Sequence, residues 1–120
     1  MNVLAVDDSQ TIRDMVTMAL NGAGFKTTTA NDGVHGLEVL SDMEPDVIIT
    51  DINMPRMDGF GFIDGVRKKS KYKGIPILVL TTENSNEMKL RAREAGATGW
   101  IVKPFEPQQL VNALHKVAGA

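Results

Sequence analysis

The sequence predicts an α/β fold in which helices cover both faces of one parallel β-sheet. Five short apolar runs with the composition of β-strands alternate along the chain with five longer segments of helical periodicity. The run Val47-Ile48-Ile49 is continuous and β-branched, which is typical of a strand buried on both faces. Because parallel strands need right-handed crossover connections, five β-α units place helices on both sides of the sheet.

The first two units carry start and stop signals. A strand at 3–6 leads to a helix that Ser9 can cap and that Gly22 and Gly24 end, since glycine tolerates the left-handed turn after a helix. The strand at 25–29 is polar on one side, so we expect it near an edge of the sheet. The apolar stripe of the first helix consists of Ile12, Met15, Val16, Ala19 and Leu20.

The second helix begins at Asp32-Gly33 and is expected to run through Met43 until Pro45 stops it. The strand at 46–50 follows, and then a loop at 53–59 with turn-forming residues. A short third helix comes next, with apolar residues at three-residue spacing. These are Phe60, Ile63 and Val66.

The last two units are shorter. A strand at 75–80 precedes a helix at 84–95 that has only a thin apolar stripe and that Gly96 ends. A strand at 99–102 and a helix at 107–117 complete the pattern. We expect the chain's seven methionines to fill the core beside these helices.

Composition narrows the function classes. A chain of 120 residues suits one domain that buries about two-thirds of its unfolded surface. The net charge of −2 gives no basic field for nucleic acid, and the absence of cysteine excludes disulfides and thiolate sites. Apolar runs are shorter than the roughly 20 residues that span a membrane. We therefore expect residues 1–120 to form a single cytoplasmic domain that binds neither nucleic acid nor membrane.

Polar residues follow four of the predicted strands at the point where each ends. They are Asp7-Asp8, Asp51, Thr81 and Lys103. Since the carboxyl ends of parallel strands lie along one edge of a sheet, we expect these groups to meet in one cleft. Three carboxylates in one cleft are costly unless a cation neutralises them, and oxygen ligands suit Mg²⁺. The sequence thus predicts a Mg²⁺ and phosphoryl site.

Each of these residues also has a purely structural interpretation. Asp7-Asp8 could cap the first helix, although one cap would suffice. Thr81 could simply fill a β position, and the adjacent Thr82 leaves the choice open by one residue. Lys103 could lie on the surface, but Pro104-Phe105 after it is expected to fix the loop. Asp51 could be a plain strand-end aspartate, but it should project from the end of a rigid central strand, so it is the best candidate nucleophile for forming an acyl phosphate.

These residues resemble the receiver domain of two-component response regulators over essentially the whole chain. The matching motifs are Val6-Asp7-Asp8, Thr50–Pro55 with Met57-Asp58-Gly59, Leu80-Thr81 and Val102–Phe105. The resemblance implies a flavodoxin-like, doubly wound (βα)5 fold with a five-stranded parallel sheet in the order 2-1-3-4-5. With no segment left for an output domain, the chain looks like the chemotaxis type, acting as a monomer.

The resemblance also implies roles for the site residues. Asp51 would accept a phosphoryl group from a phosphohistidine on a histidine sensor kinase of the chemotaxis kind. Mg²⁺ would be bound by Asp8, Asp51 and the backbone carbonyl of Asn53 directly, and by Asp7 through water. Lys103 would pair with the phosphoryl group, and Thr81 would move to donate a hydrogen bond to it.

Trp100 stands two residues before Val102-Lys103, where the family usually has tyrosine, phenylalanine or histidine. The resemblance implies that this aromatic turns inward when Thr81 moves, and the bulk of tryptophan puts a full inward movement in question. The changed surface would bind a target, such as a flagellar motor switch protein. We expect this output face to carry Lys89, Arg93, Trp100 and Asn112, with Gln109 beside them.

Two alternatives stay open at this stage. The first is a phosphate sink or phosphorelay intermediate of the same fold. The second is a Mg²⁺-dependent phosphohydrolase with an aspartyl phosphate intermediate, but such enzymes usually have an acid-base aspartate where this chain has Asn53. A flavin-binding protein is excluded because acidic Asp7-Asp8 stands where a phosphate-binding loop would be. We therefore expect a signalling protein that catalyses only its own phosphotransfer and autodephosphorylation.

Overall fold

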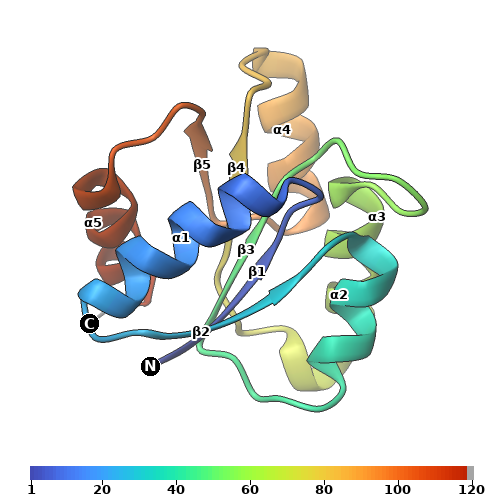
Figure 1. Ribbon diagram of the computed structural model, residues 1–120. Coiled ribbons are helices and arrows are strands. Elements are labelled where there is room, and N and C mark those ends of the chain that lie inside the picture. The colour runs from blue at the N-terminus through green and yellow to red at the C-terminus, as the bar shows by residue number, and fades with distance from the viewer. Residues whose placement is uncertain (119–120) are drawn as a thin grey trace.

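Five parallel strands form one sheet in the order β2-β1-β3-β4-β5 in the computed structural model, which describes residues 1–118 (Figure 1). The strands are β1 (Asn2–Val6), β2 (Lys26–Ala30), β3 (Val47–Thr50), β4 (Ile77–Thr81) and β5 (Gly99–Val102). The helices are α1 (Gln10–Gly22), α2 (Gly33–Leu40), α3 (Gly59–Arg67), α4 (Asn86–Ala95) and α5 (Pro107–Ala118), with a short 3-10 helix η1 (Ser70–Tyr72). The predicted fold class and strand order are confirmed, as is the edge position of β2.

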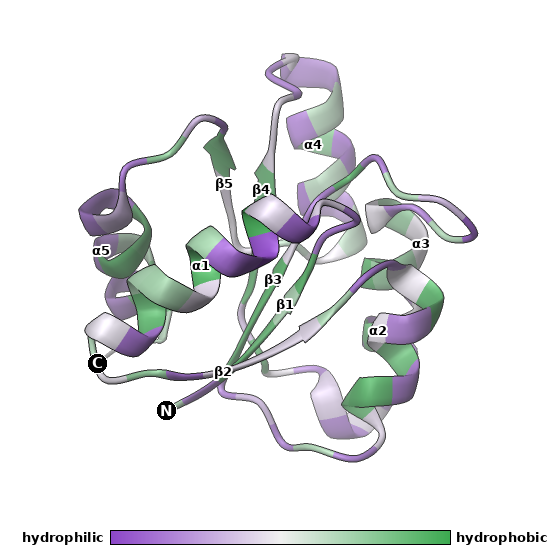
Figure 2. Cartoon of the chain, viewed as in Figure 1, coloured by the Kyte–Doolittle hydropathy of each residue, from purple (hydrophilic) through white to green (hydrophobic). Residues whose placement is uncertain are grey.

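Helices cover both faces of the sheet and bury two separate apolar layers. In Figure 1, α1 and α5 lie on the left of the sheet, and α2, α3 and α4 lie on its right. Alternate side chains of β1 divide between the layers: Val3 and Ala5 pack with α1 and α5, whereas Leu4 and Val6 pack with the other three helices. Figure 2 shows that β1 and β3 are largely hydrophobic, whereas hydrophobic and hydrophilic residues alternate along the helices. Of the described helices, none is long and apolar enough to cross a membrane.

The pairing register aligns the carboxyl ends of the central strands. Val6 of β1 pairs with Thr50 of β3, so the residues that follow them begin at the same level. Thr81 of β4 pairs with Val102 of β5, which brings residue 103 next to the end of β4. The polar residues that end these strands therefore lie along one edge of the sheet.

Side-chain caps begin the helices at that edge. Ser9, Asp32, Asp58 and Ser85 are N-caps, and each accepts a hydrogen bond from the backbone N–H three residues later. At the opposite end of α4, Gly96 has a φ of +117°, the left-handed conformation that glycine adopts without strain. The predicted start at Ser9 and stop at Gly96 are thus both confirmed.

The structure corrects three details of the predicted helices. Helix α2 ends at Leu40 and does not run through Met43 as predicted, because the hydroxyls of Ser41 and Tyr72 donate to carbonyls of its last turn. Met15 is 45% exposed and so lies outside the buried stripe of α1. The methionines contribute to the core only in part: Met43, Met54, Met57 and Met88 are partly buried and pack against the layer under α2, α3 and α4, whereas Met1, Met15 and Met18 are exposed.

Candidate functional site

Three carboxylates converge at the carboxyl edge of the sheet. One oxygen from each of Asp7, Asp8 and Asp51 lies within 4.8 Å of the other two. Asp7 and Asp51 are buried and Asp8 is exposed, so the cluster opens to solvent on one side only. Strands β1 and β3 supply the two buried members because Val6 and Thr50, their neighbours in sequence, are paired in the sheet.

Lys103 lies between the two buried carboxylates. Its Nζ donates to Asp7 Oδ2 at 2.7 Å and to Asp51 Oδ2 at 3.0 Å. Its side chain is only 10% exposed, so these charge-assisted hydrogen bonds form largely away from water. The peptide bond between Lys103 and Pro104 is cis. The hydrogen bonds of Nζ place the ammonium of Lys103, which follows β5, at the ends of β1 and β3.

Charge in this cleft is only partly balanced. Burial raises the pKa of the Asp7 carboxyl above its usual value, and the hydrogen bonds and charge of Lys103 offset that effect in part. Burial lowers the pKa of Lys103, but its hydrogen bond to Asp7 and the charges of Asp7 and Asp51 outweigh burial and raise it overall. Lys103 therefore stays charged, and three carboxylates face one ammonium.

Asp7 does not cap α1. Its Oδ1 accepts the N–H of Ser9 at 2.9 Å, and its carbonyl accepts from Arg13 at 2.8 Å. The cap itself is Ser9, whose Oγ accepts from the N–H of Ile12 at 3.3 Å. Because Ser9 already accepts a hydrogen bond from the first turn of α1, Asp7 and Asp8 are not needed as caps and their carboxylates can line the cleft.

Thr81 is the threonine that ends β4 inside the protein. It is fully buried, whereas Thr82 is exposed. Its hydroxyl accepts the backbone N–H of Glu83 at 3.4 Å. Of the two neighbouring threonines, Thr81 is therefore the one whose side chain lies inside the protein, beside the β4–α4 loop.

Glu83 connects Asn53, in the loop after β3, with Trp100 of β5. Its carboxylate accepts from Asn53 Nδ2 at 2.8 Å, and its carbonyl accepts from Trp100 Nε1 at 3.0 Å. Trp100 is half-buried and packs against the apolar layer under α2, α3 and α4. The contacts join segments 17 and 30 residues apart in the chain, which no local sequence pattern reveals.

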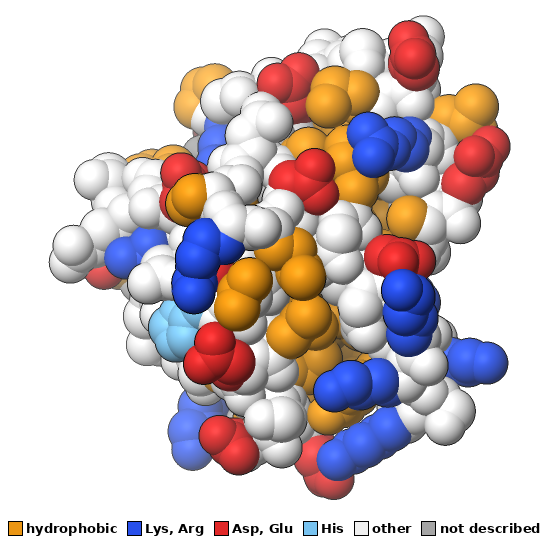
Figure 3. All heavy atoms as spheres, turned by 90° about the vertical axis from the view of Figure 1, so that its right-hand side faces the viewer, with side chains coloured by type: hydrophobic (Ala, Val, Ile, Leu, Met, Phe, Trp, Pro, Cys, Tyr) orange, Lys and Arg blue, Asp and Glu red, His pale blue; other side chains and the backbone are white. Residues whose placement is uncertain are grey.

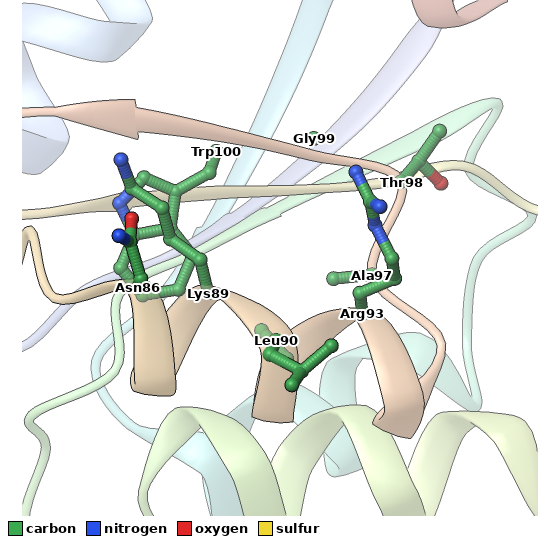
Figure 4. A pocket seen from close by; sticks show the side chains of 9 residues that line it. Asn86, Lys89, Leu90, Arg93, Ala97, Thr98, Gly99 and Trp100 are labelled. Carbon is green, nitrogen blue, oxygen red and sulfur yellow. The ribbon is translucent and has the colours of Figure 1, made fainter.

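Three of the four residues expected on an output face line one groove. Lys89 and Arg93 of α4 and Trp100 of β5 surround a cavity of about 270 Å³ (Figure 4). Leu90, which is 56% exposed, adds an apolar wall. Asn112 lies outside this groove, on the exposed side of α5, where it accepts from Gln108.

Two further interactions were not predicted from the sequence. Arg56 makes a bidentate ion pair with Asp32, and Arg91 stacks over the ring of Phe60 with 3.9 Å between the guanidinium carbon and the ring centroid. The sequence indicates Asp32 only as a cap and Arg91 only as a polar residue of a helix. Both second roles depend on residues from other elements, so sequence spacing gave no signal for them.

The donor set of the cleft fits a hard divalent cation. Carboxylate oxygens from Asp7, Asp8 and Asp51 lie close enough for one ion to reach all three. Within residues 1–118, the backbone carbonyl of Asn53 accepts no hydrogen bond and is a further free oxygen. An all-oxygen set of this kind suits Mg²⁺ rather than a softer metal.

Comparisons with known proteins agree with this geometry. The family model for the response regulator receiver domain matches residues 3–115. Chemotaxis protein CheY1 of Helicobacter pylori is 40% identical, over 99% of this chain and 98% of that protein. A sensor histidine kinase CheAY from the same species is 37% identical over 95% of this chain, which spans 14% of that longer protein.

A solved structure is similar over nearly the same extent. Chemotaxis protein CheY4 of Vibrio cholerae, crystallised at low pH, superposes with a TM-score of 0.93 and 51% identity over 97% of both chains. The strand order, the acidic cluster and the extent of the family match all lead to one assignment. The chain belongs to the response regulator receiver domain family, within which it is similar to the chemotaxis proteins CheY1 and CheY4.

Proposed function

We propose that Asp51 accepts a phosphoryl group from the phosphohistidine of a sensor kinase and that this event switches a protein-binding surface. The position of Lys103 carries the proposal, because its ammonium contacts Asp51 at 3.0 Å and Asp7 at 2.7 Å in one cleft. An ammonium at this place can balance charge on phosphoryl oxygens once they arrive at Asp51. Membership of the receiver family supports the same role.

The transfer forms one bond and breaks one. A carboxylate oxygen of Asp51 attacks phosphorus, the bond between phosphorus and the kinase imidazole nitrogen breaks, and the imidazole leaves with the electron pair. The buried Lys103 side chain offers Nζ to the oxygens of the incoming group, and the Thr81 hydroxyl lies at the next strand end, where it can donate to the same group. Hydrolysis of the acyl phosphate by water returns the carboxylate.

Mg²⁺ is the cofactor that we assign to the acid cluster. Asp8, Asp51 and the carbonyl of Asn53 would hold it, with Asp7 reached through a water. When bound, the ion neutralises negative charge that builds on the transferring phosphoryl group. The carboxylates of this chain would hold the ion in place, and the burial of Asp7 and Asp51 excludes part of the solvent.

The groove between α4 and β5 is the surface that we assign to the target. Figure 4 shows Lys89, Arg93 and Trp100 around one cavity, so a matching partner segment combines acidic and apolar side chains. Trp100 and Thr81 both bind Glu83, one through the carbonyl and one through the N–H. A movement of Thr81 toward a phosphoryl group would break its contact and alter the loop that holds Trp100.

The likeness to chemotaxis proteins favours a flagellar motor switch protein as target and a chemotaxis histidine kinase as donor, both in the cytoplasm. A phosphate sink or phosphorelay intermediate would use the same cleft without the groove. A phosphohydrolase is disfavoured because Asn53 binds Glu83 through its amide and has no acid-base function.

The test uses Trp100, the single tryptophan. Its fluorescence is followed during addition of MgCl₂ and then acetyl phosphate, with intact mass spectrometry as a second readout. We expect a Mg²⁺-dependent change and one added phosphoryl group, both absent in Asp51→Asn, which keeps the fold. If Asp51→Asn still accepts a stoichiometric phosphoryl group, the nucleophile is another residue and the proposal is wrong.

A further inference from the structure

The β3–α3 loop, residues 51–58, contains a strained turn beside the acid cluster. Arg56 has a φ of +62°, and the N–H of Met57 donates to the carbonyl of Pro55 at 2.6 Å. This hydrogen bond closes a three-residue turn with Arg56 at its centre, and a γ-turn with positive φ is the rare and strained form. A long side chain in that conformation needs other contacts to hold it there.

An ion pair supplies such contacts. The guanidinium of Arg56 donates from Nε to Asp32 Oδ2 at 2.7 Å and from Nη2 to Asp32 Oδ1 at 2.9 Å. The Asp32 side chain is 7% exposed and also caps α2 by accepting the N–H of His35 at 2.9 Å. The two N–H groups of the Arg56 guanidinium are thus bound to a carboxylate that is itself held in one place.

Backbone contacts tie the loop to the same neighbour. The N–H of Gly33 donates to the carbonyl of Met57 at 3.2 Å, and a Cβ at Gly33 would lie 2.7 Å from that oxygen. At the far end of the loop, the N–H of Gly59 donates to the carbonyl of Ile52 at 2.8 Å. The loop therefore has two fixed ends. It lies at the carboxyl ends of the strands, beside α2 and α3. Figure 3 views the side of the molecule that these helices form, where hydrophobic side chains lie between charged ones.

Asn53 lies between these fixed points. Its side chain binds Glu83 at 2.8 Å, and its carbonyl accepts no hydrogen bond within residues 1–118. The direction of that carbonyl depends on the path of the loop, because no other contact of the carbonyl holds it. A relaxed turn at Arg56 would change the path only three residues away.

We propose that Asp32 and Arg56 are a positioning pair that holds the β3–α3 loop in its strained form and thereby sets the affinity of the acid cluster for Mg²⁺. The inference rests on the proposed function, since it assigns the Asn53 carbonyl to the metal. Neither residue belongs to the acid cluster of Asp7, Asp8 and Asp51. Their effect passes through the loop, as outer contacts orient the groups that bind a metal.

An ordinary surface ion pair would have no such effect. The Arg56 side chain is 55% exposed, and exposed pairs contribute little to stability. What differs here is the combination of a bidentate contact, an almost buried carboxylate and a left-handed residue. The exposed pair of Lys68 and Asp64, at 3.3 Å near the end of α3, has none of these features and provides the matched control.

Each variant removes one feature of the pair. Arg56→Asn loses the guanidinium but keeps a residue that tolerates positive φ. Asp32→Asn loses the charge but keeps a good helix cap. Arg56→Lys keeps the charge without the fork, and Asp64→Asn breaks the control pair. The full-length chain is used throughout, with circular dichroism to verify that each variant folds.

Titration with MgCl₂, followed by Trp100 fluorescence and by calorimetry, gives the dissociation constant. We expect an increase of about tenfold in Arg56→Asn and in Asp32→Asn, as for other outer contacts of metal ligands. The dissociation constant of the double variant should be no more than about twofold higher than that of either single variant, because both changes remove the same interaction. Arg56→Lys should show a smaller increase, of roughly threefold, because a single ammonium replaces the fork. Asp64→Asn should bind like the wild type.

Amide hydrogen exchange in the metal-free protein gives an independent readout of the loop. The N–H groups of Gly33 and Gly59 should exchange at least about tenfold faster in Arg56→Asn than in the wild type, and unchanged in Asp64→Asn. The proposal is overturned if Arg56→Asn and Asp32→Asn fold and bind Mg²⁺ with an affinity within twofold of the wild type. If these two variants do not fold, wild-type affinity in Arg56→Lys overturns it instead.

The outcomes separate this proposal from the proposed function. A wild-type chain that binds Mg²⁺ but takes no phosphoryl group from acetyl phosphate or a kinase would remove the proposed function and leave the positioning pair intact. Normal phosphorylation together with wild-type Mg²⁺ affinity in every variant would remove the pair and leave the function.

Discussion

Removal of the Lys103 ammonium should destabilise the metal-free protein in a pH-dependent way. Lys103→Met keeps most of the apolar stem and leaves Asp7 and Asp51, whose side chains are 7% and 10% exposed, without their cation. Loss of one partner from a buried pair typically costs about 3–5 kcal/mol. The cleft is open at Asp8, so we expect a loss of about 3 kcal/mol at pH 7.

Proton binding limits this loss. Each pH unit above a carboxyl pKa adds about 1.36 kcal/mol to the cost of protonation, so one carboxyl of pKa 3.8 costs about 4.4 kcal/mol to neutralise at pH 7 and about 1.6 kcal/mol at pH 5. Burial already raises the pKa of Asp7, so both values are upper bounds. The destabilisation should therefore fall below about 1.6 kcal/mol at pH 5 if one proton on Asp7 relieves it.

Urea unfolding of metal-free protein, followed by circular dichroism and by Trp100 fluorescence, measures these free energies. Lys71→Met is the control, because the ion pair of Lys71 with Glu44 is exposed and long, with 4.0 Å between Nζ and the carboxylate oxygen. It should lie within about 0.5 kcal/mol of the wild type. Mg²⁺ at a hundred times its dissociation constant should return about 2.7 kcal/mol to Lys103→Met. Wild-type stability at pH 7, or a loss as large at pH 5 as at pH 7, would contradict the reasoning.

Three further predictions concern the residues around the cleft. The hydrogen bonds of Arg56 lower the pKa of Asp32 despite its burial. The difference in unfolding free energy between the wild type and Asp32→Asn should therefore be constant above pH 3.8 and vanish as the pH falls below it. Urea unfolding across that range measures this difference. A Cβ at Gly59 would collide with backbone at the end of β3; Gly59→Ala should cost about 3 kcal/mol in urea unfolding, whereas Gly22→Ala, in open space, should not destabilise. Trp100→Phe removes the donor to the β4–α4 loop and should cost about 1 kcal/mol, followed by circular dichroism.

Local signals predicted most of the fold. Helix starts at Ser9 and Asp32, the buried run of β3 and the stop at Gly96 each depend on residues within one turn or strand, and the structure has all of them. The strand order, in contrast, came from the family resemblance and not from periodicity. The η1 helix and the end of α2 were missed, because Tyr72 determines that end from 32 residues away.

The loops are where prediction from the sequence failed. Nothing about Arg56 indicates a left-handed residue, since glycine and asparagine are the usual types there. Its conformation depends on Asp32, which lies 24 residues earlier and has a sufficient local role as a cap. Glu83 likewise binds Asn53 and Trp100 from two other elements. Polar contacts between loops leave no periodic trace, so each required the structure.

The positions of the site residues, by contrast, follow from the apolar core. In β1, Val3 and Ala5 belong to one layer and Leu4 and Val6 to the other, so a slip of one residue against β3 would exchange the two sets. Both faces of the sheet are buried, and the exchange would mismatch both layers at once. The register in which Val6 meets Thr50 is thereby fixed by packing, and the two carboxylates that follow those residues must meet. Hydrophobic packing thus holds together a cluster of like charges that would otherwise separate. The ammonium of Lys103 reduces the repulsion between Asp7 and Asp51 in the metal-free protein.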